Sequence, residues 1–181
     1  MQEIRIHGRG GQGGVTSAEL LARGAINKDK HGQAFPSFGP ERRGAPVQAF
    51  VRVSDREIRL REKIYEPDIV MVLDPSLLEI ANVADGLKQD GLVVINSHDS
   101  AEKIKKKYDF PRVARVDATN IAIEELGVPI TNTTMLGALL SASGILQVED
   151  MENVVMERFG SKLGPKNLQA MNRAFAETEN A

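Results

Sequence analysis

A glycine-rich stretch near the N-terminus is the first place where this sequence could do chemistry. Residues 8–13 read Gly-Arg-Gly-Gly-Gln-Gly, a GxGxxG spacing between a strand-like and a helix-like segment. Without Cβ atoms, backbone N–H groups can approach a phosphate, and a helix N-terminus adds partial positive charge. The alternative is that the glycines serve only close packing of the strand and the helix. The candidate binding residues here are Gly8, Gly10, Gly11, Gln12 and Gly13.

A second candidate is the segment 39–46, which reads Gly-Pro-Glu-Arg-Arg-Gly-Ala-Pro. Adjacent guanidiniums such as Arg42 and Arg43 can bind phosphates bidentately, and prolines reduce the entropy lost when a loop is ordered. We expect this segment and the glycine turn to lie close together at strand ends, where they would form an anion site. The alternative is a solvated turn whose arginines pair with Glu41 or with a neighbouring subunit.

Single polar residues at the ends of predicted elements complete the candidates. Asp74 and Asn96 end apolar strands, where α/β proteins place ligands. Asn132 is a candidate cofactor contact, and Asn132 or Thr133 would also suit as the N-cap of a helix of small residues. His7 ends the first strand, and we expect a structural role for it.

Composition excludes several classes of function. The chain has 181 residues, 23 Lys and Arg, 25 Asp and Glu, and a net charge of −2, which argues against general nucleic-acid binding. It has no cysteine, so thiolate metal sites, cysteine nucleophiles and Cys-ligated clusters are excluded. Its three histidines lack metal-ligand spacing, so no metal site is expected. No apolar run reaches membrane-spanning length and no signal peptide is evident, so we expect a cytoplasmic protein.

No catalytic constellation is evident, and the catalytic residues stay unassigned. The sequence has no Ser-His-Asp order, no paired carboxylate motif and no P-loop lysine. The chain therefore lacks the residues that a stand-alone enzyme would need, which suggests a subunit whose partners carry the catalytic groups.

The elements that must position these residues follow from periodicity and punctuation. Alternation predicts a strand over residues 2–7, and Thr16 and Glu19 have capping-box spacing at the start of a helix over 16–27. A short strand is expected over 33–38, and strands over 47–53 and 57–61 are expected to form an antiparallel hairpin. Apolar runs over 68–74 and 91–96 predict central parallel strands, joined by a crossover helix over 75–85. A strand over 112–117 and helices over 120–126, 133–143, 151–159 and 166–176 follow, and a lysine-rich run over 103–107 is expected on a solvated helix face.

The expected fold is therefore α/β: one three-layer α/β/α domain over residues 1–181, with a mixed, mostly parallel sheet and a glycine-rich strand-turn-helix start. Two features weigh against a dinucleotide site. A Rossmann unit places an acidic residue at the end of its second strand, and none stands there. The first strand also alternates, whereas a Rossmann first strand is usually buried on both faces.

Taken together, the motifs resemble the gamma subunit of 2-oxoacid:ferredoxin oxidoreductases. The resemblance rests on residues 8–13, on residues 35–47 (Phe-Pro-Ser-Phe-Gly-Pro-Glu-Arg-Arg-Gly-Ala-Pro-Val), and on residues 132–138 (Asn-Thr-Thr-Met-Leu-Gly-Ala), in this order. It covers about residues 3–160. The pair formed by the glycine motif and the arginine motif is specific, whereas either one alone is weak.

The resemblance implies a function for the chain inside a complex. The family decarboxylates a 2-oxoacid oxidatively with coenzyme A (CoA), giving acyl-CoA, CO2 and reduced ferredoxin. Thiamine diphosphate would lie between alpha and beta subunits, and iron–sulfur clusters in beta and delta subunits. The chain would be inactive alone, would bind none of these cofactors by itself and could self-associate. Its glycine turn, with Arg42 and Arg43, would approach the CoA phosphates, and the 2-oxoacid would be pyruvate or a branched-chain acid.

Two alternatives stay open. In one, the chain is a non-catalytic assembly subunit of the same complex, and its two loops touch no cofactor. In the other, it is a free-standing NAD(P)-binding oxidoreductase.

Overall fold

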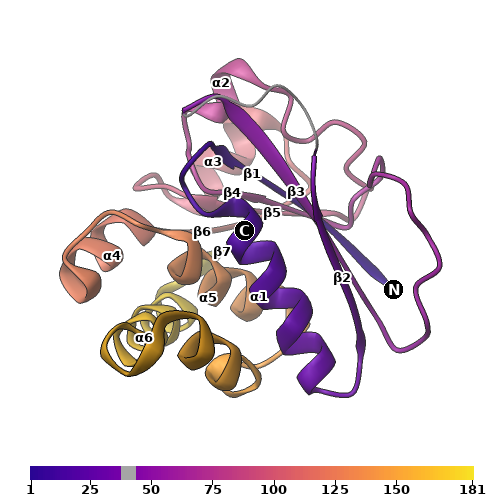
Figure 1. The fold of residues 1–181 in the computed structure, drawn as a ribbon. Coiled ribbons are helices and arrows are strands. Elements are labelled where there is room, and N and C mark those ends of the chain that lie inside the picture. Colours follow the sequence, from indigo (N-terminus) through magenta and orange to yellow (C-terminus); the bar gives the residue numbers. More distant parts are fainter. Residues whose placement is uncertain (38–43) are drawn as a thin grey trace.

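A twisted sheet of seven strands runs through the centre of the computed structural model, which describes residues 1–37 and 44–181 (Figure 1). The strand order is β2-β3-β1-β4-β5-β6-β7. The strands are β1 (Gln2–Arg9), β2 (His31–Pro36), β3 (Pro46–Ser54), β4 (Ile69–Val72), β5 (Leu92–Asn96), β6 (Arg112–Val116) and β7 (Glu179–Asn180). The helices are α1 (Gly14–Asn27), α2 (Leu77–Ile80), α3 (Ala101–Tyr108), α4 (Ala118–Leu126), α5 (Asn132–Ser143) and α6 (Glu152–Glu177), with a 3-10 turn at Glu149–Met151.

The sheet is mixed, and most of its strands run in one direction. β1, β4, β5 and β6 pair in parallel, whereas β3 pairs antiparallel with both β1 and β2. β2 therefore runs the same way as β1, and β3 and β7 run against the others. Helices α1, α4, α5 and α6 cover one face, and α2 and α3 cover the other (Figure 1). This confirms the predicted α/β fold with a mixed, mostly parallel sheet between helical layers.

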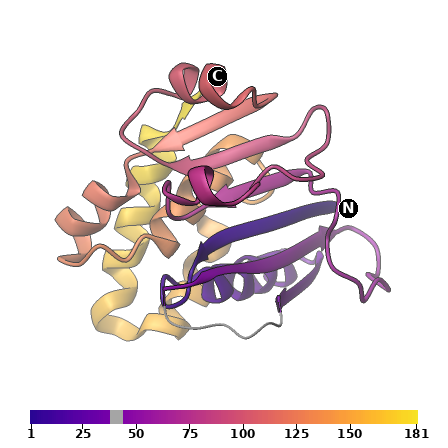
Figure 2. The ribbon, with the colours of Figure 1, turned by 90° about the horizontal axis from the view of Figure 1, so that it is seen from above.

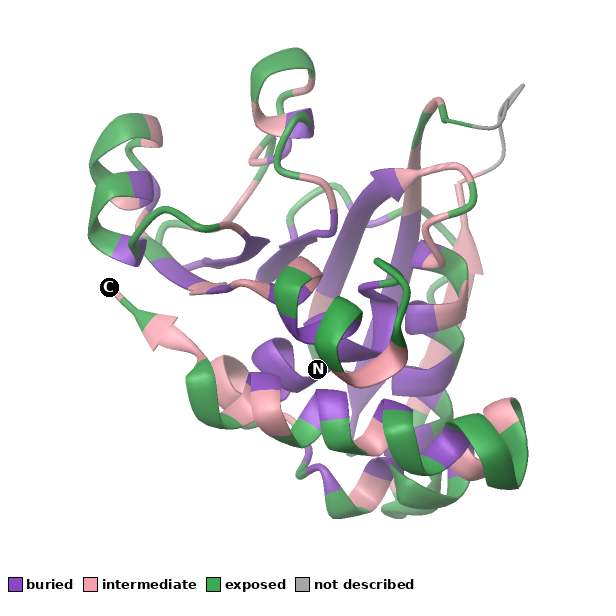
Figure 3. Cartoon of the chain, turned by 90° about the vertical axis from the view of Figure 1, so that its left-hand side faces the viewer, coloured by how far each residue is buried: buried purple, intermediate pink, exposed green. Residues whose placement is uncertain are grey.

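Apolar side chains on both faces of the central strands make the core. In Figure 3 these strands are coloured as buried, while the helices turn exposed faces outward. One cluster joins Ile6 and Met71 to α1, α5 and α6, and a second joins Val72 and Ile95 to α2 and α3. The runs over 68–74 and 91–96 thus form the predicted central parallel strands β4 and β5. None of the helices in the described part of the chain combines the length and apolar character that a bilayer span requires.

The alternation in β1 is misleading, because both of its faces are buried. The side chains of Arg5 and His7 are 5% and 4% exposed. The Arg5 guanidinium donates to His7 Nε2 (3.0 Å) and to the carbonyl oxygens of Val83 (3.0 Å) and Asp85, so its charge is enclosed by acceptors. The expectation of a one-sided first strand is therefore wrong, and so is the objection to a Rossmann-like start that it raised.

The predicted hairpin of strands 47–53 and 57–61 is also wrong. The first of these strands exists as β3, but β1 and β2 occupy its two edges and leave no edge for a third strand. Residues 57–61 form no strand. The side chains of Gln33 and Arg52 instead donate hydrogen bonds to backbone carbonyls in this stretch and just after it. Gln33 Nε2 donates to the carbonyl of Leu60 (2.9 Å), and Arg52 Nη2 donates to the carbonyl of Glu62 (2.9 Å).

The expected crossover helix over 75–85 shrinks to α2, which ends at Ile80. Ala81 is extended, with φ −138° and ψ 141°. The carbonyls of Val83 and Asp85 accept hydrogen bonds from Arg5 rather than pointing along a helix axis. Ile80, the last residue of α2, is 61% exposed, so this short helix does not present a continuous inward apolar face.

The other predicted elements are present, with small shifts at their ends. The strand expected over 33–38 is β2, which ends at Pro36, and the last two helices are joined as α6 across Gly160, whose φ of 71° is not helical. The lysine-rich run lies on α3, as expected. Figure 2 shows α1, in indigo, packed against β1 and β3, so that its first turn lies where β1 ends.

Candidate functional site

The carboxyl ends of β1, β4, β5 and β6 meet at one edge of the sheet, the usual place for ligands in an open α/β sheet. The residues that follow these strands enclose a cavity of about 380 Å³, a volume in the range of small-molecule sites. The cavity is lined by Gly11, Gln12, Leu73, Asp74, Pro75, Asn96, Thr119, Pro129, Ile130 and Thr131. The glycine turn, the strand ends and the residues that precede α5 therefore line the same cavity.

The glycine turn is tied to the segment that carries the arginine pair. Gly10 N–H donates to the carbonyl of Ala45 (2.9 Å), and Gly44 N–H donates back to the carbonyl of Gly10 (3.2 Å). Arg42 and Arg43 lie outside the described residues. Gly44, which follows them directly, is held against the turn, as expected from the two motifs lying at strand ends.

Not every glycine of the motif offers its backbone to a ligand. Gly8 is buried within β1, where it pairs with Val47, and the N–H of Gly10 is already used by Ala45. Gly11 is exposed and has a φ of 94°. Gln12 donates its backbone N–H to the carbonyl of Arg9 (3.0 Å). The part of the motif open to a ligand is therefore its second half.

Helix α1 begins directly after the turn, without a side-chain cap. Its N-cap position is Gly13, in the left-handed region with φ 83°, and Ser17 N–H makes the first helical bond, to the carbonyl of Gly13 (2.9 Å). Thr16 and Glu19 form no capping box, because the helix starts two residues before Thr16. The first amides of α1 have no intrahelical acceptor, and no side chain of the described residues caps them.

The start of α5 lies against the start of α1. A Cβ atom on Gly13 would stand 2.7 Å from Asn132 Nδ2, so the two helix ends touch here. The prediction of Asn132 or Thr133 as N-cap is wrong: Thr131 holds that position, and no side chain caps α5 within the described residues. Asn132 is 4% exposed, and its Oδ1 finds no hydrogen-bond partner in residues 1–37 and 44–181.

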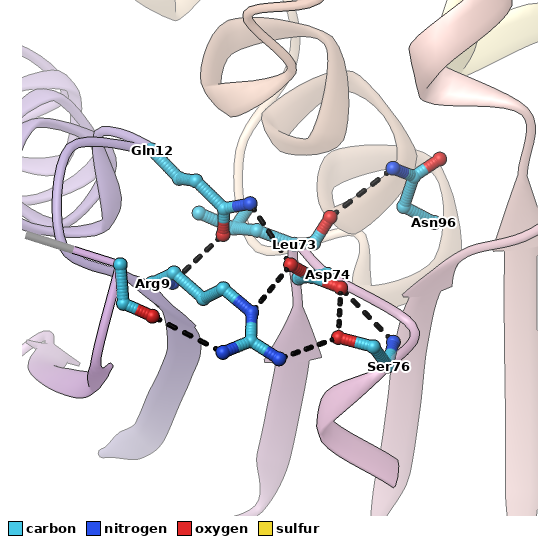
Figure 4. A network of polar contacts seen from close by, with 7 residues as sticks. Arg9, Gln12, Leu73, Asp74, Ser76 and Asn96 are labelled. Atoms are coloured by element: carbon cyan, nitrogen blue, oxygen red, sulfur yellow. Dashed lines mark hydrogen bonds and ion pairs between the residues drawn. The ribbon is translucent and has the colours of Figure 1, made fainter. Parts of the chain in front are cut away.

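A network of polar side chains braces the turn (Figure 4). Arg9 Nε donates to Asp74 Oδ2 (2.9 Å), and Gln12 Nε2 donates to the same oxygen (3.1 Å). Gln12 Oε1 in turn accepts from Arg9 N–H (2.7 Å). The other carboxylate oxygen of Asp74 accepts from Ser76 N–H (3.0 Å) and from the Ser76 hydroxyl (2.6 Å). The side chain of Gln12 is thus used inside the protein.

The charge of Asp74 is balanced locally. Burial alone would raise the pKa of Asp74, but hydrogen bonds from Ser76, Gln12 and Arg9 outweigh it and lower the pKa below its usual value. The carboxylate therefore stays ionised, and its charge is paired with the Arg9 guanidinium. Because this pair is neutral overall, it adds no net positive charge for an anion at the cavity.

Sequence reasoning placed Asp74 at this edge but missed Arg9 and Ser76. The sequence signal for them was weak: Arg9 lies inside the glycine motif, and Ser76 lies two residues after Asp74. The other strand-end residues have structural partners: Asn96 Nδ2 donates to the carbonyl of Leu73 (3.1 Å) and to Thr119 Oγ1 (2.9 Å). Burial and then the neighbouring Arg5 lower the pKa of His7 to about 4, so the imidazole is neutral and structural, as expected.

The arrangement presents backbone N–H donors at the junction of two helix N-termini, where the partial positive charge favours an anion. β2 carries no carboxylate, so the described residues lack the acidic group that a dinucleotide ribose requires. In the same residues no group of three or more His, Asp or Glu side chains could hold a metal ion.

Comparison with known proteins places this geometry in context. The sequence profile of a family described as pyruvate ferredoxin/flavodoxin oxidoreductase matches residues 3–177. The common subunit gamma of the pyruvate/ketoisovalerate oxidoreductases of Pyrococcus abyssi is 51% identical over 181 residues, covering 99% of this chain and 98% of that protein. The pyruvate synthase subunit PorC of Methanocaldococcus jannaschii is 51% identical over 178 residues, covering 98% and 97%.

Solved structures agree with the sequence comparison. The pyruvate oxidoreductase subunit PORC of Thermotoga maritima matches with a TM-score of 0.89 at 36% identity, over 99% of this chain and 98% of that one. A 2-oxoglutarate:ferredoxin oxidoreductase from Magnetococcus marinus, solved with 2-oxoglutarate, coenzyme A and succinyl-CoA bound, matches with a TM-score of 0.77 at 20% identity. That match spans 97% of this chain and 30% of the larger one, and at this identity it shows the shared fold alone.

Proposed function

Because the chain belongs to the pyruvate ferredoxin/flavodoxin oxidoreductase family, as a chain of the gamma-subunit type, we propose that it helps to close the CoA site of a thiamine-diphosphate-dependent 2-oxoacid:ferredoxin oxidoreductase. The complex would convert a 2-oxoacid, CoA and two oxidised ferredoxin equivalents into acyl-CoA, CO2 and two reduced ferredoxin equivalents. The relatives are named for pyruvate and ketoisovalerate, which supports pyruvate or a branched-chain acid as the substrate.

The division of labour in this proposal follows from what the chain lacks. With no cysteine it cannot hold an iron–sulfur cluster through thiolates, and the proposal assigns the clusters to the beta and delta subunits, as the family resemblance implies. Thiamine diphosphate would lie between the alpha and beta subunits. The contribution of this chain is to bind and orient CoA, not to carry electrons.

The observation that carries the proposal is the open N-terminus of α1 beside the tethered end of the arginine segment. CoA carries a diphosphate and a 3′-phosphate, which need N–H donors and cations. Gly11, Gly13 and the first turn of α1 supply donors, and the hydrogen bonds of Gly44 and Ala45 to Gly10 bring the chain that follows Arg43 to the same turn. Since Arg9 is neutralised by Asp74, Arg42 and Arg43 are the proposed cations.

The test is the substitution Arg42→Ala in the assembled complex. Losing one charged contact should raise the KM for CoA about tenfold, equivalent to about 1.4 kcal/mol, with kcat and assembly retained. Arg59→Ala is the matched control, since this arginine is 85% exposed and pairs with Glu57, away from the cavity. A weaker complex with an unchanged KM for CoA would contradict the proposal and favour a pure assembly role.

A further inference from the structure

Arg9 is the arginine of the glycine motif, and its guanidinium joins three separate parts of the chain. Its Nε donates to Asp74 Oδ2 (2.9 Å), its Nη2 donates to the Ser76 hydroxyl (2.8 Å), and its Nη1 donates to the carbonyl of Gly44 (3.1 Å). The turn after β1, the corner between β4 and α2 (Figure 4), and Gly44 of the arginine segment therefore converge on one side chain.

The geometry argues against a direct role for Arg9 in holding an anion. All three guanidinium nitrogens already donate to acceptors within the protein, and the nearest carboxylate neutralises the charge. Bidentate recognition of a phosphate needs two parallel N–H groups that point outward. The side chain is 29% exposed, but Arg9 is not among the residues that line the cavity.

Asp74 completes the arrangement from the other side. One of its oxygens accepts from both Arg9 and Gln12, and the other accepts twice from Ser76. The carboxylate thereby fixes the positions of Arg9 and Gln12 relative to the start of α2. Removing either charge leaves the other partly buried and without its partner, which is costly.

We propose that Arg9 and Asp74 act as positioning residues for CoA: their ion pair fixes the glycine turn against residues 44–45, so that the first amides of α1 meet the phosphates in one geometry. The inference rests on the proposed function, because it assigns the ion pair a role in that same site. A positioning role and a direct ligand role predict different effects of Arg9→Lys on the KM for CoA. A direct phosphate ligand tolerates Lys in part, whereas a positioning fork loses its contacts to Gly44 and Ser76 on the same change.

The experiment compares Arg9→Lys, Asp74→Asn and the double variant in the assembled complex, with CoA as the varied substrate. We expect each single variant to raise the KM for CoA about fivefold to tenfold, with kcat within about twofold of the parent. The double variant should be no worse than the poorer single one, because both substitutions loosen the same junction between the turn, Gly44 and Ser76. Arg173→Lys is the control: its guanidinium also binds carboxylates and is 31% exposed, but its partners are Glu124, Glu125 and Glu177.

Asp74→Asn gives the sharpest answer. If Asp74 served only as a negative charge near the anion, its removal would lower the KM for CoA, and this result would overturn the proposal. An unchanged KM in Arg9→Lys would overturn it as well. If neither variant assembles, Ser76→Ala decides, since it removes one contact from each partner; we expect a rise of about twofold to threefold, and no rise contradicts the proposal.

The outcome is separable from the proposed function itself. If Arg42→Ala raises the KM for CoA while Arg9→Lys and Asp74→Asn leave it unchanged, the positioning role fails and the CoA site stands. If none of the three changes it, the CoA site fails.

Discussion

Four of the longer helices that begin near the same edge of the sheet, α1, α3, α4 and α5, begin in two different ways. At α3, the Ser100 hydroxyl accepts from Lys103 N–H (3.3 Å), and the Glu179 carboxylate accepts from Ala101 N–H (3.1 Å). At α4, the Asp117 carboxylate accepts from Asn120 N–H (3.1 Å). At α1 and α5, no side chain of the described residues takes this role.

The difference shows at which helix starts no side chain of the described residues accepts from the first backbone amides. A helix N-terminus presents amides that need acceptors, and most helices satisfy some of them with a cap. The capped ends of α3 and α4, which we call closed, satisfy part of this need with side chains of the chain itself. The two open ends, α1 and α5, touch each other at Gly13 and Asn132 and adjoin the cavity, and in the proposed function a CoA phosphate would be the acceptor for α1.

The largest effect is expected from Gly13→Ala, which would disturb the contact between the two open ends. The added Cβ would stand 2.7 Å from Asn132 Nδ2, at a backbone φ of 83° that disfavours any residue with a side chain. We expect the free energy of unfolding to fall by about 3 kcal/mol, measured by urea denaturation. Gly127→Ala is the matched control, because its φ is 76° but no atom lies within 4 Å of the new Cβ. Its cost should be about 1 kcal/mol, and equal costs at the two glycines would remove the argument that the open ends are tightly packed together.

The next effect concerns the strand that leads into the open end of α1. Because burial, followed by Arg5, lowers the pKa of His7 to about 4, the unfolded chain binds the proton more tightly than the folded one. This contribution to stability is complete above the usual His pKa and is lost as the pH falls toward 4. Between pH 7.5 and pH 5 we expect a loss of about 2 kcal/mol in the free energy of unfolding. His7→Gln should abolish that part of the pH dependence; an unchanged pH slope in this variant would show that His7 is not its source.

A smaller effect is expected at a closed end. Asp117→Ala removes the cap of α4 and should lower the free energy of unfolding by about 1 kcal/mol. The KM for CoA of the assembled complex should not change, since α4 binds its own cap. A rise in KM comparable to that of Arg42→Ala would erase the distinction between closed and open ends.

The smallest effect is expected from Thr16→Ala at the open end. Since Thr16 caps nothing, the free energy of unfolding should change by less than about 0.5 kcal/mol. A loss of about 1 kcal/mol would mean that the threonine does cap α1, as its spacing to Glu19 had suggested.

These helix ends also show what the sequence can predict and what it cannot. The apolar runs that became β4 and β5 were recognisable because strands buried on both faces exclude polar residues. The caps of α1 and α5 were predicted from residue types alone, and both predictions are wrong. Whether a Thr or Asn caps a helix depends on the exact residue where the helix starts, which close packing at Gly13 decides.

Long-range partners were beyond the reach of sequence patterns. Arg9 and Asp74 are separated by 65 positions, and only the parallel pairing of β1 with β4 brings them together. The alternation of β1 predicted a strand but could not show that carbonyls of Val83 and Asp85 would enclose the charge of Arg5. The strand-turn-helix around the glycine motif was predictable, because that motif is local.

The most direct test of the open end is hydrogen–deuterium exchange of the assembled complex with and without CoA. We predict that CoA slows exchange in peptides that contain the amides of residues 11–16 and leaves those at the starts of α3 and α4 unchanged. Pantetheine, which lacks the phosphates, should give no protection at residues 11–16. Protection by CoA that is absent from these residues, or that pantetheine reproduces in full, would contradict the assignment of the phosphates to the start of α1.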